Sequence, residues 1–235
     1  MNCYISYICN DDYLPGIVAL VKSLKYHQCK HDIIVMITSG VSDKSIEIIS
    51  DLGAIIKKID EIHYTGNLSH TIEDRYGKKN ISWMTFTKIN IWKQTEYEKL
   101  FYIDADMVVL QNIDSIFEKN CTENNISAVF GGSDYHKYKG IESGVLLIKP
   151  ATKLYNGLVE AMNSDKYDLR MSDQTLINDY FLKHHNISYL DEKWNRLQKK
   201  NTNTDGAYIY HWNGRKPWQD KDIPNFNIWN FYYKL

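Results

Sequence analysis

The sequence predicts an α/β fold in which a mostly parallel sheet carries helices on both faces. The first half of the chain alternates short apolar runs with helical patterns, which is the order of βαβ units. The length of 235 residues suits one domain that buries a substantial core. Apolar residues make up 43% of the chain, within the range of globular proteins. We therefore expect a single domain over residues 1–235.

The regular elements of the first half begin with a strand at Cys3–Ile8. A helix is predicted over Leu14–Tyr26, because Pro15 fits its first turn and apolar residues recur at helical spacing. Strands and helices then alternate, and we expect them at Asp32–Thr38, Ser42–Leu52, Ala54–Ile59, Trp83–Gln94 and Leu100–Ile103. This order implies parallel strands that are joined by crossover helices.

The second half is less regular. Short apolar runs predict strands, and we expect these at Ser127–Phe130, Gly144–Lys149 and Tyr208–Trp212. Helical patterns cover Thr152–Met162 and Ser172–Leu182. The aromatic segment 219–235 predicts a C-terminal helix that docks on the core, with a partner or acceptor surface as the alternative.

Composition and charge exclude some functions. A net charge of −1 does not favour nucleic acid, because its binding usually needs a basic face. No stretch approaches the ~18 apolar residues of a membrane span. The first residues lack the basic leader of a secretory signal, so a cytoplasmic protein is expected. The four cysteines form no metal-type pair and are expected to be free thiols. The abundance of Lys, Asn, Ile and Tyr is typical of an AT-rich source such as a large virus, a parasite or a bacterium.

An acidic pair, Asp104 and Asp106, follows the strand predicted at Leu100–Ile103. Residues i and i+2 of an extended chain face the same side, so both carboxylates can converge on one cation. Ligands of open α/β sheets bind beyond the carboxyl ends of strands, and oxygen donors suit Mg²⁺ or Mn²⁺. The structural alternative is a strand-end turn whose acids cap a helix. Asp220 and Asp222 have the same spacing but follow no apolar strand, so they receive no role.

A longer string around this pair is much more specific. Residues Phe101 to Asp114 read FYIDADMVVLQNID. This string resembles the glycogenin-like and galactinol synthase-like members of glycosyltransferase family 8, in which a strand ends in D-A-D and N-I-D follows an apolar run. Further segments match motifs of that family in the family's order, and they are Asn10–Tyr13, Thr87–Ile89, Ser143–Val145, Ser172–Gln174 and His211–Trp218. The resemblance extends over about residues 3–218.

The resemblance implies a GT-A fold and a retaining transfer of a hexose, glucose first among them, from a UDP-sugar to a hydroxyl acceptor. It implies Mn²⁺ as cofactor, with Mg²⁺ as the alternative. The acceptor would be a glycan, a protein or a small polyol, and a homodimer is left open. The nucleotide would bind in a half over residues 1–110, the sugar and acceptor in a half over 111–218.

The resemblance also assigns roles to single residues. The metal ligands that it implies are Asp104, Asp106 and His211. The donor-binding residues that it implies are Asn10, Tyr13, Lys88, Asp104, Ala105, Asp106, Ser143, Gly144, Gly214 and Lys216. The catalytic residues that it implies are Asp173, Gln174 and Lys88.

Each assignment has a physical basis and a plain alternative. The ammonium of Lys88 could balance diphosphate charge, or it could be a surface lysine. Imidazole from His211 together with two carboxylates suits Mn²⁺ better than Mg²⁺, although a lone histidine is more often structural. Gly214 would let the backbone approach the diphosphate, and Lys216 would pair with its oxygens. Asp173 could simply be a first-turn acid of a helix.

Retention of configuration requires either two inversions or attack on the face that the leaving group departs from. Two inversions need a nucleophile beside the anomeric carbon, and Asp173 is the matched carboxylate for that role. Gln174 is a poor nucleophile and fits electrostatic support of same-face attack. The sequence leaves both routes open.

Several positions depart from the family pattern. Glu142 stands where glycogenins have asparagine, and Arg170 stands where they have an acid, so the donor sugar is uncertain. Gly214 and Lys216 lie one residue closer together than usual. The short polar stretch 201–206 holds no counterpart of the acceptor tyrosine of glycogenins, which argues against a self-glucosylating primer.

Two other functions compete with the transferase. A phosphatase of the haloacid dehalogenase type also has D-x-D after a strand, but Gly-Thr usually follows it, whereas Met107-Val108 follow here. The second is a catalytically weak module that binds a UDP-sugar or a glycan without turnover. Retention of all three expected metal ligands argues against it.

Overall fold

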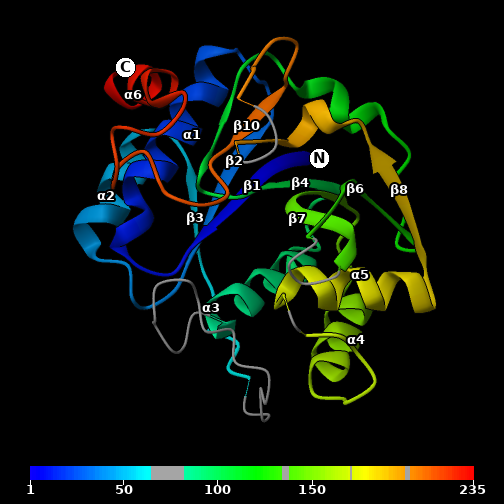
Figure 1. Cartoon of the computed structure of the whole chain (residues 1–235). Helices are drawn as coiled ribbons and strands as arrows, with labels where there is room; N and C mark the ends of the chain where they lie inside the picture. Colours follow the sequence, from blue (N-terminus) through cyan, green and yellow to red (C-terminus); the bar gives the residue numbers. More distant parts are fainter. Residues whose placement is uncertain (65–81, 134–137, 170, 199–201) are drawn as a thin grey trace.

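A seven-stranded sheet forms the centre of the computed structural model, which describes residues 1–64, 82–133, 138–169, 171–198 and 202–235 (Figure 1). The strands lie in the order β3-β2-β1-β4-β7-β6-β8. In that order they cover Ile55–Lys58, Asp32–Ile37, Asn2–Ile8, Lys99–Ile103, Tyr138–Ile148, Asn125–Ser133 and Asn186–Leu190. Strands β3, β2, β1 and β4 are parallel to one another, and β8 is parallel to β6. Strand β7 runs antiparallel to both of its neighbours. The sheet is therefore mixed but mostly parallel, as predicted.

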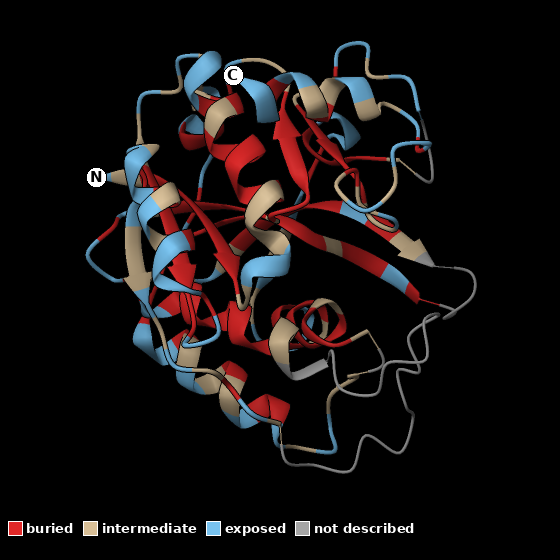
Figure 2. Ribbon diagram, turned by 90° about the vertical axis from the view of Figure 1, so that its left-hand side faces the viewer, coloured by how far each residue is buried: buried red, intermediate tan, exposed pale blue. Residues whose placement is uncertain are grey.

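Helices cover both faces of this sheet. One face packs against α1 (Leu14–Tyr26) and α2 (Asp43–Asp51) through Leu20 and Ile49. The other face packs against α4 (Thr152–Met162) and α5 (Asp173–His184) through Leu158 and Phe181. The central strands are buried on both sides, which explains their continuous apolar runs (Figure 2).

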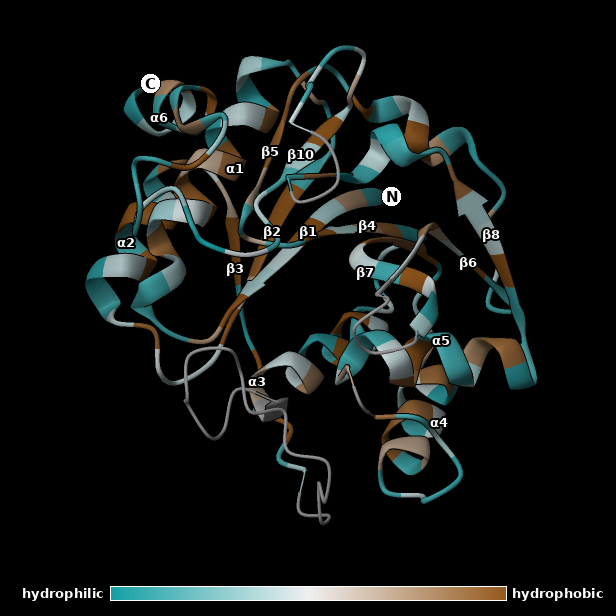
Figure 3. Cartoon of the chain, viewed as in Figure 1, coloured by the Kyte–Doolittle hydropathy of each residue, from teal (hydrophilic) through white to brown (hydrophobic). Residues whose placement is uncertain are grey.

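The helices are amphipathic, and hydrophilic and hydrophobic residues alternate along α2, α5 and α6 (Figure 3). Helix α6 (Phe226–Lys234) lies against α1 and buries Trp229 and Tyr232. This packing confirms the predicted C-terminal helix. No helix among the described residues has the length and apolar character needed to cross a membrane. All four cysteines are free, as expected.

The helix predicted over Trp83–Gln94 is two elements in the structure. A short α-helix, α3 (Ser82–Phe86), is followed by a 3₁₀-helix, η2 (Thr87–Lys93). The segment is therefore helical, as predicted, but its second part takes the 3₁₀ form, in which Asn90 gives the backbone an additional partner. Its side-chain amide donates to the carbonyls of Thr87 and Asp60, each at 3.0 Å.

A second, three-stranded sheet was not expected in full. It has the order β5-β10-β9, and these strands cover Met107–Val109, Ile209–His211 and Arg196–Leu197. Of these strands the sequence predicts only β10. Strands β5 and β9 are too short for a periodic pattern. Strand β8 of the seven-stranded sheet was not predicted either, because most of its residues are exposed and its sequence shows little alternation of apolar and polar residues.

Candidate active site

The acidic pair lies in the turn that joins the two sheets. Asp104 follows β4, Ala105 and Asp106 form a turn, and Met107 begins β5. The two carboxylates do converge, but the extended segment predicted for them is absent. A turn brings them together, because β4 and β5 belong to different sheets. Asp106 is 8% exposed, so its carboxylate lies almost wholly within the protein.

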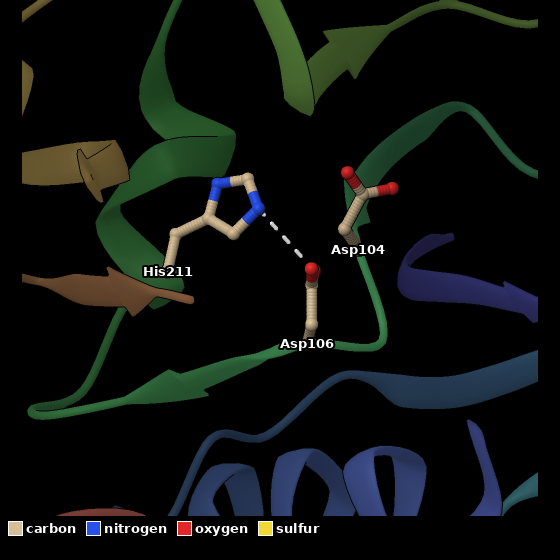
Figure 4. A group of neighbouring side chains, drawn as sticks. All are labelled: Asp104, Asp106 and His211. Atoms are coloured by element: carbon tan, nitrogen blue, oxygen red, sulfur yellow. Dashed lines mark ion pairs between the residues drawn. The ribbon is translucent and has the colours of Figure 1, made fainter. Parts of the chain in front are cut away.

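His211 reaches this turn through strand pairing. Strand β10 runs antiparallel to β5, and His211 lies opposite Met107. One candidate ligand atom from each of Asp104, Asp106 and His211 lies within 4.8 Å of the others. The three side chains point toward a common space, and Nε2 of His211 lies 3.3 Å from Oδ1 of Asp106 (Figure 4). Two carboxylates and one imidazole suit a divalent transition metal such as Mn²⁺.

The other ring nitrogen of His211, Nδ1, forms a hydrogen bond with a buried side chain. Nδ1 lies 2.9 Å from Oδ1 of Asn195, a side chain that is 2% exposed. An amide oxygen can only accept, so Nδ1 carries the proton and Nε2 offers its lone pair toward the carboxylates. This is the arrangement in which metal-ligating histidines are usually oriented.

Gly144 of β7 lies next to Asp104 and His211. Its carbonyl accepts from the backbone N–H of Asp104 at 2.9 Å, which fixes β7 against the acidic turn. A Cβ atom at Gly144 would lie 3.0 Å from Cε1 of His211 and 3.1 Å from Oδ2 of Asp104. A side chain there would crowd Asp104 and His211, so the glycine leaves room beside these two ligands, and the residues present fit a metal ion there.

A cavity of about 250 Å³ opens beside these ligands. Residues of the first half that line it are Tyr7, Ile8, Cys9, Tyr13, Met84, Thr85, Lys88, Tyr102, Asp104, Ala105 and Asp106. Residues of the second half that line it are Ser143, Met171, Asp173 and Gln174. The structure thus gathers eight of the sequence-predicted residues around one cavity, namely Tyr13, Lys88, Asp104, Ala105, Asp106, Ser143, Asp173 and Gln174.

Lys88 connects the acidic turn with helix α5. The lysine projects from η2 and is 5% exposed, so the surface alternative is excluded. Its Nζ lies 3.2 Å from Oδ1 of Asp104 and 2.8 Å from Oδ2 of Asp173. Burial lowers the pKa of Lys88, but these two carboxylates outweigh burial and raise it above its ordinary value. The ammonium therefore stays charged and holds the two acids in place.

The two aspartates of the turn have different electrostatic surroundings. Burial raises the pKa of Asp104, and the nearby charge of Lys88 offsets only part of this effect. Burial would raise the pKa of Asp106 as well, but the charge of Lys216 outweighs burial and holds it well below its usual range. Asp106 is therefore firmly ionised at neutral pH, as a metal ligand must be.

Helix α5 begins at the cavity, and its first two side chains share Ser143 on β7. Oδ2 of Asp173 accepts from the hydroxyl of Ser143 at 2.8 Å, and Oε1 of Gln174 accepts from the backbone N–H of Ser143 at 3.3 Å. The preceding residue, Ser172, has φ 54° and ψ −128°, which is rare for a residue with a side chain. Such strain costs on the order of 1–3 kcal/mol and is typical of functional sites.

Besides His211, four predicted residues lie outside the cavity lining. Gly144 and Lys216 still contact the acidic turn, and Nζ of Lys216 forms an ion pair with Asp106 and a 2.9 Å hydrogen bond to the carbonyl of Trp212. Asn10 caps the 3₁₀-helix η1 (Asp11–Tyr13), because its side chain accepts from the N–H of Asp12. Gly214 lies in the loop after β10, where its N–H donates to the carbonyl of Trp212 at 2.7 Å.

Of Glu142 and Arg170, the two residues that replace those of the family pattern, the structure describes only the first. The carboxylate of Glu142 accepts from the N–H of Gly132 at 3.2 Å and is not among the cavity-lining side chains. Arg170 lies outside the described residues.

The sequence interpretation missed two residues that hold the site. The hydroxyl of Tyr102 donates to Oδ1 of Asp104 at 2.6 Å, and Nζ of Lys88 lies 4.9 Å from the centre of its ring. Its position two residues before Asp104 could have indicated it, because alternate residues of a strand share a face. Asn195 leaves no comparable signal, since its place beside His211 depends on the pairing of β9 with β10.

Known proteins resemble this chain over most of its length. The family model described as Glycosyl transferase family 8 matches residues 4–222. Glycogenin-1 of Oryctolagus cuniculus is 30% identical over 183 residues, which are 77% of this chain and 50% of that protein. A protein of Arabidopsis thaliana, named putative UDP-glucuronate:xylan alpha-glucuronosyltransferase 4, is 27% identical over 217 residues, which are 89% of this chain and 35% of that protein. The chain thus spans half or less of the length of these relatives.

Solved structures of glycosyltransferases share the fold. The galactosyltransferase LgtC, solved with donor and acceptor sugar analogs, matches with a TM-score of 0.72 at 17% identity, covering 100% of this chain and 95% of LgtC. GlyE of Streptococcus pneumoniae matches with a TM-score of 0.70 at 19% identity, covering 100% of this chain and 61% of GlyE. These likenesses confirm the GT-A type of fold. Because the family model covers well over half of the sequence, the chain belongs to glycosyl transferase family 8.

Proposed function

We propose that this chain transfers a hexose from a UDP-sugar to a hydroxyl acceptor, with retention of configuration and with Mn²⁺ as cofactor. The observation that carries the proposal is the convergence of Asp104, Asp106 and His211 beside a cavity that Asp173 also lines. This arrangement suits a substrate with a diphosphate at one end and a sugar at the other. Mg²⁺ is the alternative cation.

The residues around the acidic turn would bind the diphosphate. When bound, a divalent cation neutralises the charge that develops on the departing diphosphate. Lys216 brings a second positive charge to Asp106 and could pair with phosphate oxygens. Tyr13 lines the cavity from η1, which follows β1, and a uridine would lie there if residues 1–110 form the nucleotide-binding half.

The residues at the start of α5 would act on the sugar. Asp173 shares its Oδ2 between an ammonium and a hydroxyl, which lowers its nucleophilicity. We therefore favour same-face attack, in which Asp173 positions sugar hydroxyls. Gln174 turns its amide oxygen to Ser143, so its NH₂ end is available to the cavity. That NH₂ group could donate a hydrogen bond to a sugar oxygen and so orient the sugar as the bond to UDP breaks.

The donor needs an experiment, because the relatives bear names of different activities. UDP-glucuronate appears in the name of the Arabidopsis relative, whereas glycogenin-1 motivates UDP-glucose. Release of UDP from UDP-glucose, UDP-galactose and UDP-glucuronate should be measured with Mn²⁺ and with a chelator. We expect metal-dependent release from at least one donor.

The matched variants are Asp106→Asn and Asp222→Asn, because both lie in a D-x-D sequence. Asp106→Asn should abolish Mn²⁺-dependent donor binding in calorimetry while the fold remains intact. Asp222 is exposed, so Asp222→Asn should bind the donor as the unmodified protein does. Equal donor affinity in both variants would remove Asp106 from the site. Absence of turnover together with intact donor binding would favour the binding-module alternative.

The acceptor is proposed only by class, as a glycan, a protein or a small polyol. Intact-mass measurement after incubation with UDP-glucose and Mn²⁺ tests the self-glucosylating alternative directly. An added mass of one or more hexoses would support a primer role.

A further inference from the structure

A second cavity, of about 330 Å³, lies between α4 and α5. Its lining residues are Gly157, Glu160, Ala161, Ser164, Lys166, Tyr167, Tyr180 and His184. None of them lines the cavity beside the metal ligands. The proposed transfer reaction uses none of these side chains, so this cavity requires a separate explanation.

Aromatic rings form much of its wall. The ring centres of Tyr167 and Tyr180 are 6.3 Å apart, and that of His184 lies 5.1 Å from Tyr180 and 6.2 Å from Tyr167. The hydroxyl of Tyr167 is 2.6 Å from Nε2 of His184, which holds these two rings together. Gly157 makes room for Tyr180, because a Cβ there would collide with the Tyr180 hydroxyl. The rings are therefore fixed relative to one another.

Polar groups of mixed charge complete the wall. Glu160, Ser164 and Lys166 contribute a carboxylate, a hydroxyl and an ammonium, and all three are at least partly exposed. The mixture does not favour an anionic ligand, which would need an excess of positive charge, nor a lipid, which would need an apolar wall. A sugar chain presents C–H groups on its ring faces and hydroxyls at its rim. Aromatic rings beside scattered donors and acceptors match that chemistry.

Helix α5 connects this cavity with the active site. Tyr180 and His184 follow Asp173 by seven and eleven residues, which places all three within about 20° of one direction around the helix. Their axial separation from Asp173 is about 10 Å and about 17 Å. Met171, two residues before α5, lines the first cavity, whereas Ser164, two residues after the end of α4, lines the second. A sugar chain bound at the second cavity would thus lie within reach of the active site.

We propose that the cavity between α4 and α5 binds a neutral oligosaccharide and holds an acceptor glycan near the active site. Only the acceptor role rests on the proposed transferase function. Binding itself requires neither metal nor UDP-sugar, so the two proposals fail independently.

Binding of maltohexaose and xylohexaose, which are neutral chains of α- and β-linkage, tests this inference. Titration calorimetry or saturation-transfer NMR should be run in chelator without UDP-sugar. We expect saturable binding of at least one probe, which Mn²⁺ and UDP together do not displace. Tyr167→Ala should weaken it tenfold or more, and Glu160→Gln should weaken it severalfold.

A matched control is Tyr189→Ala, because Tyr189 is an exposed tyrosine on β8 that lines neither cavity. It should bind the probe with unchanged affinity. All variants should release UDP from the donor at the unmodified rate, since none of the substituted residues lines the active site. Glu160 is exposed, so its variant keeps the test decisive if Tyr167→Ala does not fold.

Three outcomes would overturn the inference. The first is an absence of saturable binding of either probe at concentrations up to about 10 mM. Even a weak site, with a Kd of about 1 mM, would be largely occupied at that concentration. The second is displacement of the probe by Mn²⁺ and UDP, which would place it in the active site. The third is an unchanged affinity in both Tyr167→Ala and Glu160→Gln.

Discussion

Single side chains at this site work through the partners that orient them. His211 can ligate a metal only through a nitrogen that carries a lone pair, and Asn195 decides which nitrogen that is. The amide of Asn195 is buried, and its Nδ2 has no hydrogen-bond partner among the described residues. Such an unpaired buried donor costs free energy. We interpret Asn195 as a positioning residue that is retained in spite of this cost.

Replacing Asn195 should therefore affect metal binding more than any other property of the protein. We expect Asn195→Ala to lower Mn²⁺ affinity by about 10- to 100-fold, as is usual when the partner of a ligating histidine is lost. Asn195→Asp keeps an acceptor and should retain most of the affinity. Electron paramagnetic resonance titration of Mn²⁺ measures both. Asn178→Ala removes another buried amide, whose oxygen accepts from Ile141, and serves as control. Equal Mn²⁺ affinity in all of these variants would contradict the assignment.

Elements far apart in the chain are joined by specific polar contacts as well as by the core. Asp114 begins the 3₁₀-helix η3 (Asp114–Glu118), accepts from the hydroxyl of Tyr4 on β1 at 2.7 Å and accepts from the N–H of Lys30 at 3.1 Å. Burial would raise the pKa of Asp114, but these hydrogen bonds outweigh burial and lower it below its ordinary value of 3.8. Asp114 therefore ties η3 to β1 and to the loop between α1 and β2, and its role in the matched sequence string is structural.

The lowered pKa of Asp114 predicts a pH dependence of stability. A carboxyl whose pKa is depressed by folding stabilises the protein above pH 3.8, and this contribution is lost as the pH falls through the folded-state pKa. At pH 7, Asp114→Asn should cost about 1 kcal/mol of unfolding free energy, since the contacts are partly solvated. The cost should shrink as the pH is lowered from about 5 to about 2. Urea denaturation across this range measures it.

Asp51→Asn is the matched control for this pH series. Asp51 is exposed at the end of α2, so its replacement should change little at any pH. A difference between unmodified protein and Asp114→Asn that stays constant down to pH 2 would contradict the hydrogen-bonding role of the carboxylate.

Across the whole molecule, the C-terminal helix supports the active site from a distance. Trp229 of α6 packs against Trp218, with ring centres 6.1 Å apart, and Trp218 meets Tyr13 edge-to-face at 5.6 Å. Tyr13 lines the cavity, and Trp218 also closes over Gly16 of α1. A row of aromatic rings thus extends from the last helix to the proposed nucleotide site.

Removal of the ring at the far end of this row should affect both stability and donor binding. Trp229→Ala is expected to lower the unfolding free energy by about 3 kcal/mol or more, because Trp229 is 5% exposed. Donor affinity should fall as well, since Trp218 loses its support. Phe231→Ala on the same helix removes a ring that is 47% exposed and should cost below about 1 kcal/mol. Denaturation and donor titration of both variants separate the two effects. Equal losses of stability and of donor affinity in Trp229→Ala and Phe231→Ala would argue against a supporting role of this row of rings.

The sequence by itself determined the features that depend on local patterns. Apolar runs and helical spacing were sufficient for β1, α1, β2, α2 and α4, because burial imposes a period on each element separately. The position of Asp104 and Asp106 after a buried strand was equally local. The ordered motifs then indicated most of the residues that line the cavity.

Only the tertiary structure decided how these parts meet. Asp106 lies beside His211 because β10 pairs with β5. Such a pairing between short strands that are distant in the sequence produces no periodic pattern in the sequence of either strand. The turn at Ala105, the bridge that Lys88 forms between Asp104 and Asp173, and the support of His211 by Asn195 arise in the same way. The cavity between α4 and α5 likewise depends on the packing of two helices. Local sequence selects an element and the face that it buries, whereas long-range packing selects the neighbours that a side chain meets.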